Sequence, residues 1–365
     1  MNEVEVNEYA SQVLLGITSD LNENFYSDKE GELKFFWSQG AVNAWAESEY
    51  FESHKPIHKI VMTYELVNSL YLFSKAYQNF MIGNQDSEVF ISLYENMSIK
   101  PRFPEFDIPE EGAKNMFLGA ITWIYFHEFG HLNQEHGYIK QKLGNVGHSA
   151  VSFFEAYNDS GSASSEDFSM SHAFELAADF EATEYCITEL ARHFFTREEF
   201  LGESEISDES REQFLNAIFI FVSGLSCAMY LFYGSEKREK SKTPTGSHPD
   251  PLRRLGSAIP HLIERMDILR SFNPAMLSTS REDLSSLCFG ASDSYGFFWN
   301  LVVETKDIES AVHTANDPFF VSYWSEIIKN WDLINAEVIG VRHFGSPLGV
   351  LRFSEHFRNR VFNSN

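Results

Sequence analysis

The chain has 365 residues, 43% of them hydrophobic, which is enough for a sizeable core in one domain or two. The aromatic content of 15% excludes a disordered protein. The formal net charge of −25 disfavours nucleic acid as a partner, because an acidic surface repels a phosphate backbone. A short basic run at residues 237–242 is diluted by an acidic residue and indicates a solvated loop.

Three cysteines, Cys186, Cys227 and Cys288, are widely spaced and odd in number. Such a set is neither a disulfide framework nor a thiolate zinc site, and it fits a reducing compartment. The acidic N-terminus lacks the basic and apolar regions of a secretory signal. The sequence therefore predicts a cytoplasmic location.

The N-terminal third predicts helices and one edge strand. Residues 1–55 form amphipathic pieces separated by polar turns, one of them at residues 27–31. Residues 57–80 predict a single helix that begins after Pro56, because apolar residues recur there at helical spacing. Residues 88–99 are the best strand candidate, and the prolines that follow place such a strand at a sheet edge.

Residues 121–137 contain the sequence His-Glu-Phe-Gly-His, which starts at His127 and follows an almost wholly apolar run. That run suits a helix buried in the middle of a domain, beginning near residues 110–113, where acidic residues favour a helix start. On a helix, His127 and His131 project from the same face and can bind one zinc ion, with Glu128 beside them. Gly130 suits a close approach by another backbone.

A second helix is predicted at residues 171–182, after a serine-rich stretch at residues 160–167. The serine-rich stretch indicates a surface loop, with a lid over the site as the alternative. A zinc site with two histidines needs a third protein ligand, and Glu175 can supply it. Asp179 lies one turn further along the same face and could accept the free N–H of a ligating histidine.

These motifs resemble those of the gluzincin metallopeptidases, in particular the branch that contains the HtpX-like heat-shock proteases and the CAAX-processing proteases. The resemblance lies in the motif from 127 to 131, in Glu175 with Asp179, and in a His-Pro box that starts at His248 and includes Arg254. It covers roughly residues 112–265. In general plan, the chain is also similar to the Lit-like phage-exclusion peptidases.

The resemblance implies a zinc-dependent endopeptidase that acts on a protein or peptide substrate. His127, His131 and Glu175 would hold Zn²⁺, and Glu128 would be the general base for a zinc-activated water. His248 would lie near the substrate oxyanion. The edge strand predicted at residues 88–99 could then align an extended substrate by main-chain pairing.

Two further residues of these motifs would act indirectly. By the resemblance, Asp179 orients a zinc-binding imidazole, most plausibly that of His127, and Arg254 helps to pin the His-Pro box. Within that box, Asp250 and Pro251 also have the pattern of a helix N-cap and first helical residue. His136 and His148 are interpreted as surface residues or as supports for the ligands.

Several alternatives stay open. A metzincin would need Gly at position 134 and His at position 137, where this chain has Gln134 and Gly137, so that class is excluded. Residues 214–233 carry no charge and are long enough to span a bilayer, but a core helix is favoured, because one crossing would separate Glu175 from His248. Other functional interpretations are a non-catalytic regulatory protein on a zincin scaffold, and a zinc hydrolase of a non-peptide bond.

The fold class that follows is α+β and predominantly helical, with a zincin-like core and a small sheet. We expect an N-terminal helical and edge-strand region at 1–111, a catalytic core at 112–265 and a C-terminal helical region at 266–365. In the last region, residues 318–334 predict a helix whose aromatic residues pack on the core. Nothing in the sequence indicates an oligomeric state.

Overall fold

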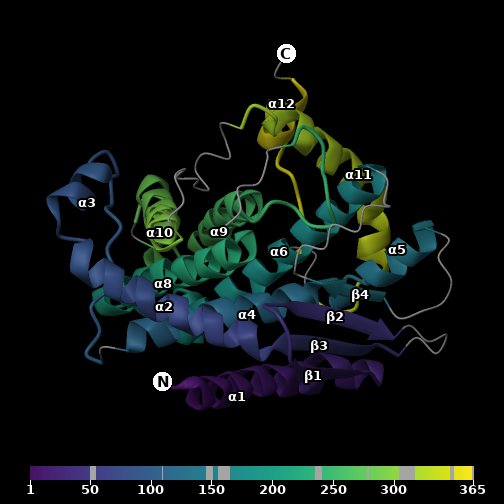
Figure 1. Ribbon diagram of the computed structural model, residues 1–365, viewed down its shortest axis with the longest axis horizontal. Helices are drawn as coiled ribbons and strands as arrows, with labels where there is room; N and C mark the ends of the chain where they lie inside the picture. Colours follow the sequence, from purple (N-terminus) through teal and green to yellow (C-terminus); the bar gives the residue numbers. More distant parts are fainter. Residues whose placement is uncertain are drawn as a thin grey trace.

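The fold, a computed structural model, is described for residues 1–49, 55–108, 110–144, 151–154, 165–234, 241–277, 279–303, 317–345 and 349–363. The described part is predominantly helical with one small mixed sheet, which confirms the predicted α+β class. Figure 1 shows the sheet lying between helix α1 (Glu3–Leu21) and the larger helical part of the molecule.

Long helices form most of the body. They are α2 (Tyr64–Asn84), α4 (Glu111–Asn133), α6 (Ser165–Phe194), α8 (Asp208–Tyr233), α9 (Pro251–Phe272), α10 (Arg281–Val302) and α11 (Phe320–Val341). Shorter pieces connect or flank them: η1 (Asn22–Tyr26), η2 (Ser27–Lys29), α3 (Glu88–Leu93), α5 (His136–Gly144), α7 (Arg197–Phe200), η3 (Pro274–Met276) and α12 (Glu355–Phe362).

The sheet has four strands in the order β1-β3-β2-β4. They are β1 (Glu32–Ser38), β2 (Ala44–Glu49), β3 (Ile57–Thr63) and β4 (Val151–Phe154). β1 pairs with β3 in parallel, whereas β2 is antiparallel to both β3 and β4, with Ala46 opposite Ile60 on one side and Phe153 on the other. The central strands β2 and β3 contact α4, so the sheet supports the helix that carries the zinc-binding motif.

The predicted helix at residues 57–80 is correct only from Tyr64 onward, because residues 57–63 form strand β3. The apolar residues of that segment fit both periods, and its β-branched residues pair with two neighbouring strands. Thr63 then ends the strand and caps the helix, since its hydroxyl accepts a hydrogen bond from the Leu66 amide.

The strand predicted at residues 88–99 is wrong, because residues 88–93 form helix α3. Ser87 is its N-cap and accepts a hydrogen bond from the Phe90 amide. Phe90 and Tyr94 are buried, whereas Val89 and Ile91 are exposed, so burial follows a helical and not an alternating period. The proposed role of this segment as a substrate-aligning edge strand therefore loses its basis.

Helix α4 begins at Glu111, as predicted, and runs through the main hydrophobic core. Helix α8 packs against it and contains the uncharged run at residues 214–233. Among the described residues, α8 is long and apolar enough to cross a membrane, and 78% of that apolar window is buried inside the protein. In the described structure α8 thus has the surroundings of a core helix, as the sequence favoured.

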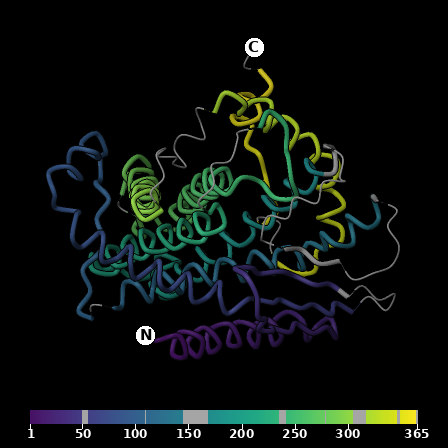
Figure 2. Tube along the Cα trace, in the orientation of Figure 1, coloured from purple at the N-terminus to yellow at the C-terminus, as the bar shows by residue number. Residues whose placement is uncertain are grey.

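A second, smaller hydrophobic cluster joins α11 to α6. Tyr323, Trp324 and Trp331 of α11 are buried in it together with Phe174 of α6. Figure 2 shows the yellow C-terminal segments running along the teal part of the chain that contains α5 and α6. The predicted C-terminal helix and its packing on the core are confirmed, and α11 extends to Val341.

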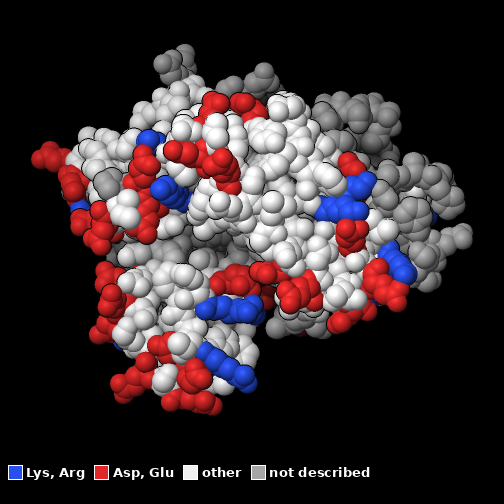
Figure 3. All heavy atoms as spheres, turned by 90° about the horizontal axis from the view of Figure 1, so that it is seen from below, with Lys and Arg blue, Asp and Glu red and all other residues white. Residues whose placement is uncertain are grey.

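Some predicted features lie outside the described residues: the loop as far as residue 164, His148, and residues 237–240 of the basic run. Helix α6 begins at Ser165, so the end of the predicted loop is helical. On the face seen in Figure 3, acidic side chains are spread over the surface and basic ones occur in small groups. The described part of that face presents no extended basic patch.

Candidate metal centre

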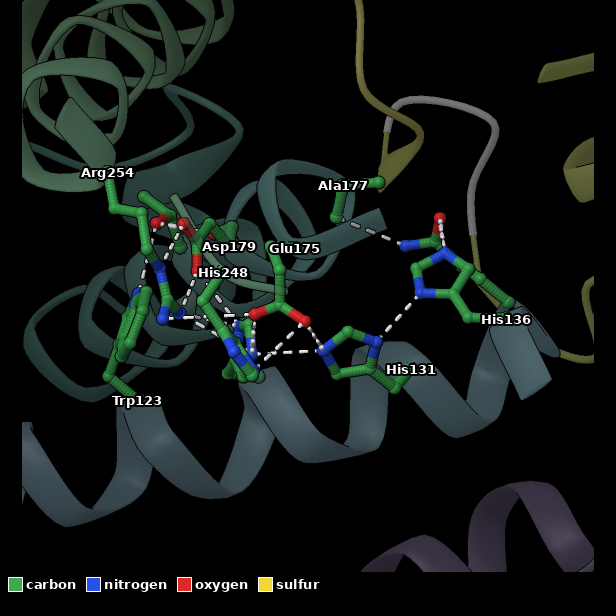
Figure 4. Close-up of polar contacts among 11 residues, drawn as sticks. Trp123, His131, His136, Glu175, Ala177, Asp179, His248 and Arg254 are labelled. Atoms are coloured by element: carbon green, nitrogen blue, oxygen red, sulfur yellow. Dashed lines mark hydrogen bonds and ion pairs between the residues drawn. The ribbon is translucent and has the colours of Figure 1, made fainter. Parts of the chain in front are cut away.

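Helix α4 presents the two histidines of the zinc-binding motif on one face (Figure 4). His127 and His131 are buried, and their Nε2 atoms lie 3.1 Å apart. Glu128, between them in sequence, is also buried. Burial in the core fixes the helix and therefore the separation of the two rings.

Helix α6 crosses α4 at Gly130 and brings Glu175 to the two histidines. A Cβ atom at Gly130 would lie 3.1 Å from the Cα of Ala178, which confirms the close backbone approach expected at this glycine. Oε2 of Glu175 lies 3.4 Å from Nε2 of His127, and its Oε1 lies 3.3 Å from Nε2 of His131. The structure thus brings together the three ligands named from the sequence.

The spacing of these atoms fits a tetrahedral zinc ion. Ligand atoms at 2.0–2.1 Å from such an ion lie about 3.3 Å from one another. The three observed separations between the ligand atoms of His127, His131 and Glu175 run from 3.1 to 3.4 Å. In addition, Oε2 of Glu175 is buried and accepts no hydrogen bond from a described residue. The donor set and its geometry therefore fit a metal ion.

His127 is held from behind by a carboxylate and a guanidinium group. Its Nδ1 lies 2.9 Å from Oδ1 of Asp179, to which Nδ1–H donates. Arg254 binds both oxygens of Asp179, with Nη2 to Oδ1 at 2.6 Å and Nε to Oδ2 at 2.9 Å. Trp123 stacks on the His127 ring with centroids 5.5 Å apart. This arrangement fixes the ring and directs its Nε2 lone pair toward Glu175.

His131 is held by another imidazole. The Gln134 amide donates from Nε2 to the carbonyl of Ala177 and to Glu181, so its Oε1 accepts from Nε2–H of His136 at 3.2 Å. Burial lowers the pKa of His136 well below its usual range, so the ring is neutral and its Nδ1 is an acceptor. Nδ1–H of His131 donates to that atom at 2.9 Å.

These hydrogen bonds leave both neutral ligand rings without a hydrogen on Nε2, since each donates from Nδ1. The two lone pairs then face each other across 3.1 Å between His127 and His131. Two lone pairs at that separation repel, and a cation between them removes the repulsion. The centre is therefore arranged for a positive ion.

Glu175 has the charge that a metal ligand requires. Burial raises the pKa of Glu175, but the neighbouring His248 and His131, together with the close contact of His127, outweigh it. Its pKa is held well below the usual range. The carboxylate is therefore anionic at neutral pH.

His248 lies at the edge of the centre, in the segment before α9. Its Nε2 is 3.6 Å from Oε1 of Glu175, and its Nδ1 is 2.8 Å from the Ser247 hydroxyl. Asp250 accepts from the Leu252 and Arg253 amides, which confirms the predicted N-cap of α9. The same short segment thus starts a helix and presents an imidazole to the centre.

The segment that carries His248 is tied to two other helices through His172 of α6. Nε2–H of His172 donates to the Gly246 carbonyl at 3.1 Å, and the Tyr323 hydroxyl lies 2.9 Å from its Nδ1. Burial, followed by the nearby His248, lowers the pKa of His172 to about 3, so this ring is neutral. His172 was not identified from the sequence.

Sequence reasoning missed other supporting residues as well, namely Trp123, Gln134 and Glu181. One signal was available, because residues 133–136 are consecutive polar residues at the end of an apolar helix, and all four are buried. A run of polar residues beside a metal motif indicates buried hydrogen-bond partners. Their pairing with α6 could not be read from that run.

All seven residues named from the sequence lie on three elements of one region: α4, α6, and α9 with the segment before it. Residues 84–267, half of the chain, match the family model of peptidase U49 and include all three. Comparison with curated proteins and with solved structures found no match. The matched half of the chain is the half that builds the centre, and the protein belongs to the peptidase U49 family.

Proposed function

We propose that this peptidase is a zinc-dependent endopeptidase of gluzincin type that hydrolyses a protein or peptide substrate. The observation that carries the proposal is the convergence of His127, His131 and Glu175, with two imidazole lone pairs facing each other at 3.1 Å beside an anionic carboxylate. The order of its three motifs supports a position near the HtpX-like and CAAX-processing branch.

His127, His131 and Glu175 would hold the zinc ion. When bound, zinc supplies Lewis-acid chemistry, because it polarises a carbonyl oxygen and lowers the pKa of water toward 7. Asp179 and Arg254 keep His127 in its ligating tautomer. The buried setting of these groups excludes bulk water and strengthens their electrostatic effects.

Glu128 is the proposed general base. It accepts a proton from the attacking water as the water oxygen bonds to the substrate carbonyl carbon, and it then delivers that proton to the leaving amine. One water is consumed, and the peptide bond yields a carboxyl and an amino group. The position of Glu128 beside His127 on the same buried helix suits this role.

His248 is the proposed donor to the carbonyl oxygen as negative charge develops there. With the Ser247 hydroxyl donating to Nδ1, the hydrogen of His248 lies on Nε2, the atom that faces the centre. One well-placed donor of this kind contributes about 3–4 kcal/mol to transition-state stabilisation.

The proposal extends to the cellular setting. The three cysteines are free and buried, which suits a reducing cytoplasm. The acidic composition argues against a nucleic-acid partner. The substrate class is protein or peptide, as for other peptidases.

The test compares cleavage of unfolded casein by the wild type and by Glu128→Gln. The variant should bind as much zinc as the wild type, because its ligands are intact, and should lose activity by on the order of 10²–10⁴-fold. Zinc is measured by plasma mass spectrometry and cleavage by mass spectrometry of new termini. Glu111→Gln is the matched control, since it makes the same change in the first turn of the same helix.

Three outcomes would contradict the proposal in different ways. Full activity of Glu128→Gln would remove the proposed base. Activity that persists after complete removal of zinc would remove the metal. A wild type that binds zinc and cleaves no peptide bond would favour the regulatory interpretation or a non-peptide substrate.

A further inference from the structure

A second group of metal-binding side chains lies where three distant segments of the chain meet. His58 belongs to β3, Glu135 to the turn between α4 and α5, and His343 to the segment just after α11. Nε2 of His58 lies 3.4 Å from Oε1 of Glu135, and Nε2 of His343 lies 2.6 Å from the same oxygen. The ligand atoms of all three lie within 4.8 Å of one another.

The His58 ring is held as a metal-binding imidazole commonly is. His58 is fully buried, and its Nδ1 lies 2.7 Å from the Tyr26 hydroxyl, on the side away from Glu135. Histidines that bind a metal through one nitrogen are usually fixed by a hydrogen bond at the other. The His343 side chain is 16% exposed, so it is the member through which ions and water can reach the group.

Glu135 reaches this position through an uncommon backbone conformation. Its φ of +50° lies in the left-handed region, which costs a residue with a Cβ atom about 1–2 kcal/mol. This turn ends α4 and aims the Glu135 carboxylate at His58 and His343. The second carboxylate oxygen accepts from Ser48 of β2 at 3.4 Å.

We propose that His58, Glu135 and His343 form a second divalent-metal site, best suited to zinc. Two imidazoles and one carboxylate are a donor set that zinc takes in proteins, with water in the fourth position. Donor atoms around a tetrahedral zinc lie about 3.3 Å apart. The pair His58–Glu135 already has that spacing, and the pair Glu135–His343 reaches it when the partly exposed His343 ring moves by about 0.7 Å.

The position of this site indicates a structural role. A bound ion would join the C-terminal segment to the sheet and to the end of α4, only four residues after His131. His58 and His343 both lie outside the segment at 84–267 that matches the family. The site therefore belongs in part to the flanking regions of this chain, and it does not depend on the proposed hydrolysis.

The rival interpretation is a hydrogen-bonded clamp in which Glu135 accepts from both imidazoles and no ion binds. The two interpretations differ in zinc stoichiometry. The wild-type protein, stripped of metal and dialysed against zinc chloride at pH 7.5, should bind about two zinc ions per chain if both sites exist. His343→Gln should bind about one, and His127→Ala/His131→Ala, which lacks the candidate catalytic centre, should also bind about one.

Combining the three substitutions should abolish zinc binding, whereas His356→Gln, a change at an exposed histidine, should leave the wild-type content. A wild type with about one zinc ion, lost in His127→Ala/His131→Ala and kept in His343→Gln, would overturn the site in favour of the clamp. If His343→Gln does not fold, the count in His127→Ala/His131→Ala decides alone: about one ion supports the second site and none overturns it. Because that variant is hydrolytically dead, the result is separate from the test of the proposed function.

Discussion

The two ligand histidines of the candidate centre are oriented by different chemistry. His127 donates to the carboxylate of Asp179, a common partner for a ligating histidine, whereas His131 donates to the neutral imidazole of His136. A carboxylate makes the donor ring more basic than a neutral imidazole does. The tautomer of His131 therefore depends on a chain of neutral hydrogen bonds that ends at Gln134.

We expect His136→Leu to weaken zinc binding by about 10–100-fold, because nothing then accepts Nδ1–H of His131 and the ring loses its fixed tautomer. His136→Gln keeps an acceptor oxygen near that position and should lose less. Competition with a chromophoric chelator gives both affinities. Equal, wild-type affinity in the Leu and Gln variants would show that His136 has no part in orienting His131.

At the level of single residues, the sequence predicts best what local geometry determines. His127 and His131 follow from the helical period, and Glu175 and Asp179 from the same spacing on a second helix. The part played by His136 could not be predicted, because the chain leaves α4 through the left-handed conformation of Glu135. A helix continued past residue 134 would have carried His136 to another direction.

At the level of elements, the centre depends on how closely α4 packs on its neighbours. α8 approaches α4 at Gly224, where a Cβ atom would overlap the carbonyl oxygen of Met116 and lie 3.2 Å from the amide nitrogen of Ala120. Both contacts are backbone atoms of a buried helix, which cannot move without disturbing the rows that carry the histidines.

We expect Gly224→Ala to lower the free energy of unfolding by about 1–3 kcal/mol, as overpacking does in a tight core. Gly16→Ala is the matched control, because Gly16 lies inside α1, where an added Cβ would have no atom within 4 Å, and alanine there should add up to about 1 kcal/mol. Urea unfolding followed by circular dichroism measures both. A stabilised Gly224→Ala variant would contradict the close packing of α8 on α4.

The packing of α9 on α6 gives a pH dependence. The His261 ring of α9 stacks on Phe180 of α6 with centroids 3.5 Å apart. Burial, followed by the charge of Arg265, lowers the pKa of His261 from 6.5 to about 3, and Glu184 lies 4.0 Å from its Nε2. Since the pKa is lower in the folded state, the unfolded chain binds more protons, and stability falls as the pH drops from about 6.5 toward 3.

His261→Phe keeps the stacking and removes the titrating group. Between pH 7 and pH 5, the free energy of unfolding should fall by about 2 kcal/mol more in the wild type than in this variant. Urea titrations at the two pH values give the comparison. The same pH dependence in both proteins would show that His261 does not titrate differently in the folded and unfolded states.

Element type was predictable where one pattern dominated and ambiguous where two patterns coincided. The long apolar runs of α4 and α8 allowed only helices of that length. Residues 57–63 fit helix and strand alike, and pairing with β1 and β2 decided for a strand. In α3, a serine cap and two buried aromatics outweighed the β-branched residues that favoured a strand.

At the scale of the whole molecule, the C-terminal region is joined directly to the end of the metal-binding helix. The guanidinium of Arg342 lies 2.6 Å from Oε1 of Glu181. The amide of His343 donates to the Asn133 carbonyl at 3.0 Å, and the Asn133 side chain exchanges two hydrogen bonds with the backbone of Phe344. The contacts of Asn133 join residues more than 200 positions apart, which no local pattern in the sequence could indicate.

The main core likewise includes buried residues from α1 and β1 as well as from α8, α9 and α10. The regions outside the family segment thus pack against the helices that build the centre. The predicted division at residues 111 and 265 stays a prediction about how the chain is organised in folding. What the flanks add to the centre is support, through the sheet under α4 and the contacts of residues 342–344.

The claim on which the proposed function depends is that His127, His131 and Glu175 bind one zinc ion together. Anomalous diffraction from crystals of the zinc-loaded protein, recorded on both sides of the zinc absorption edge, tests it most directly. We expect a peak about 2.0–2.2 Å from Nε2 of each histidine and from a carboxylate oxygen of Glu175. A map without a peak there, or a peak bound by the histidines with Glu175 turned away, would contradict the claim.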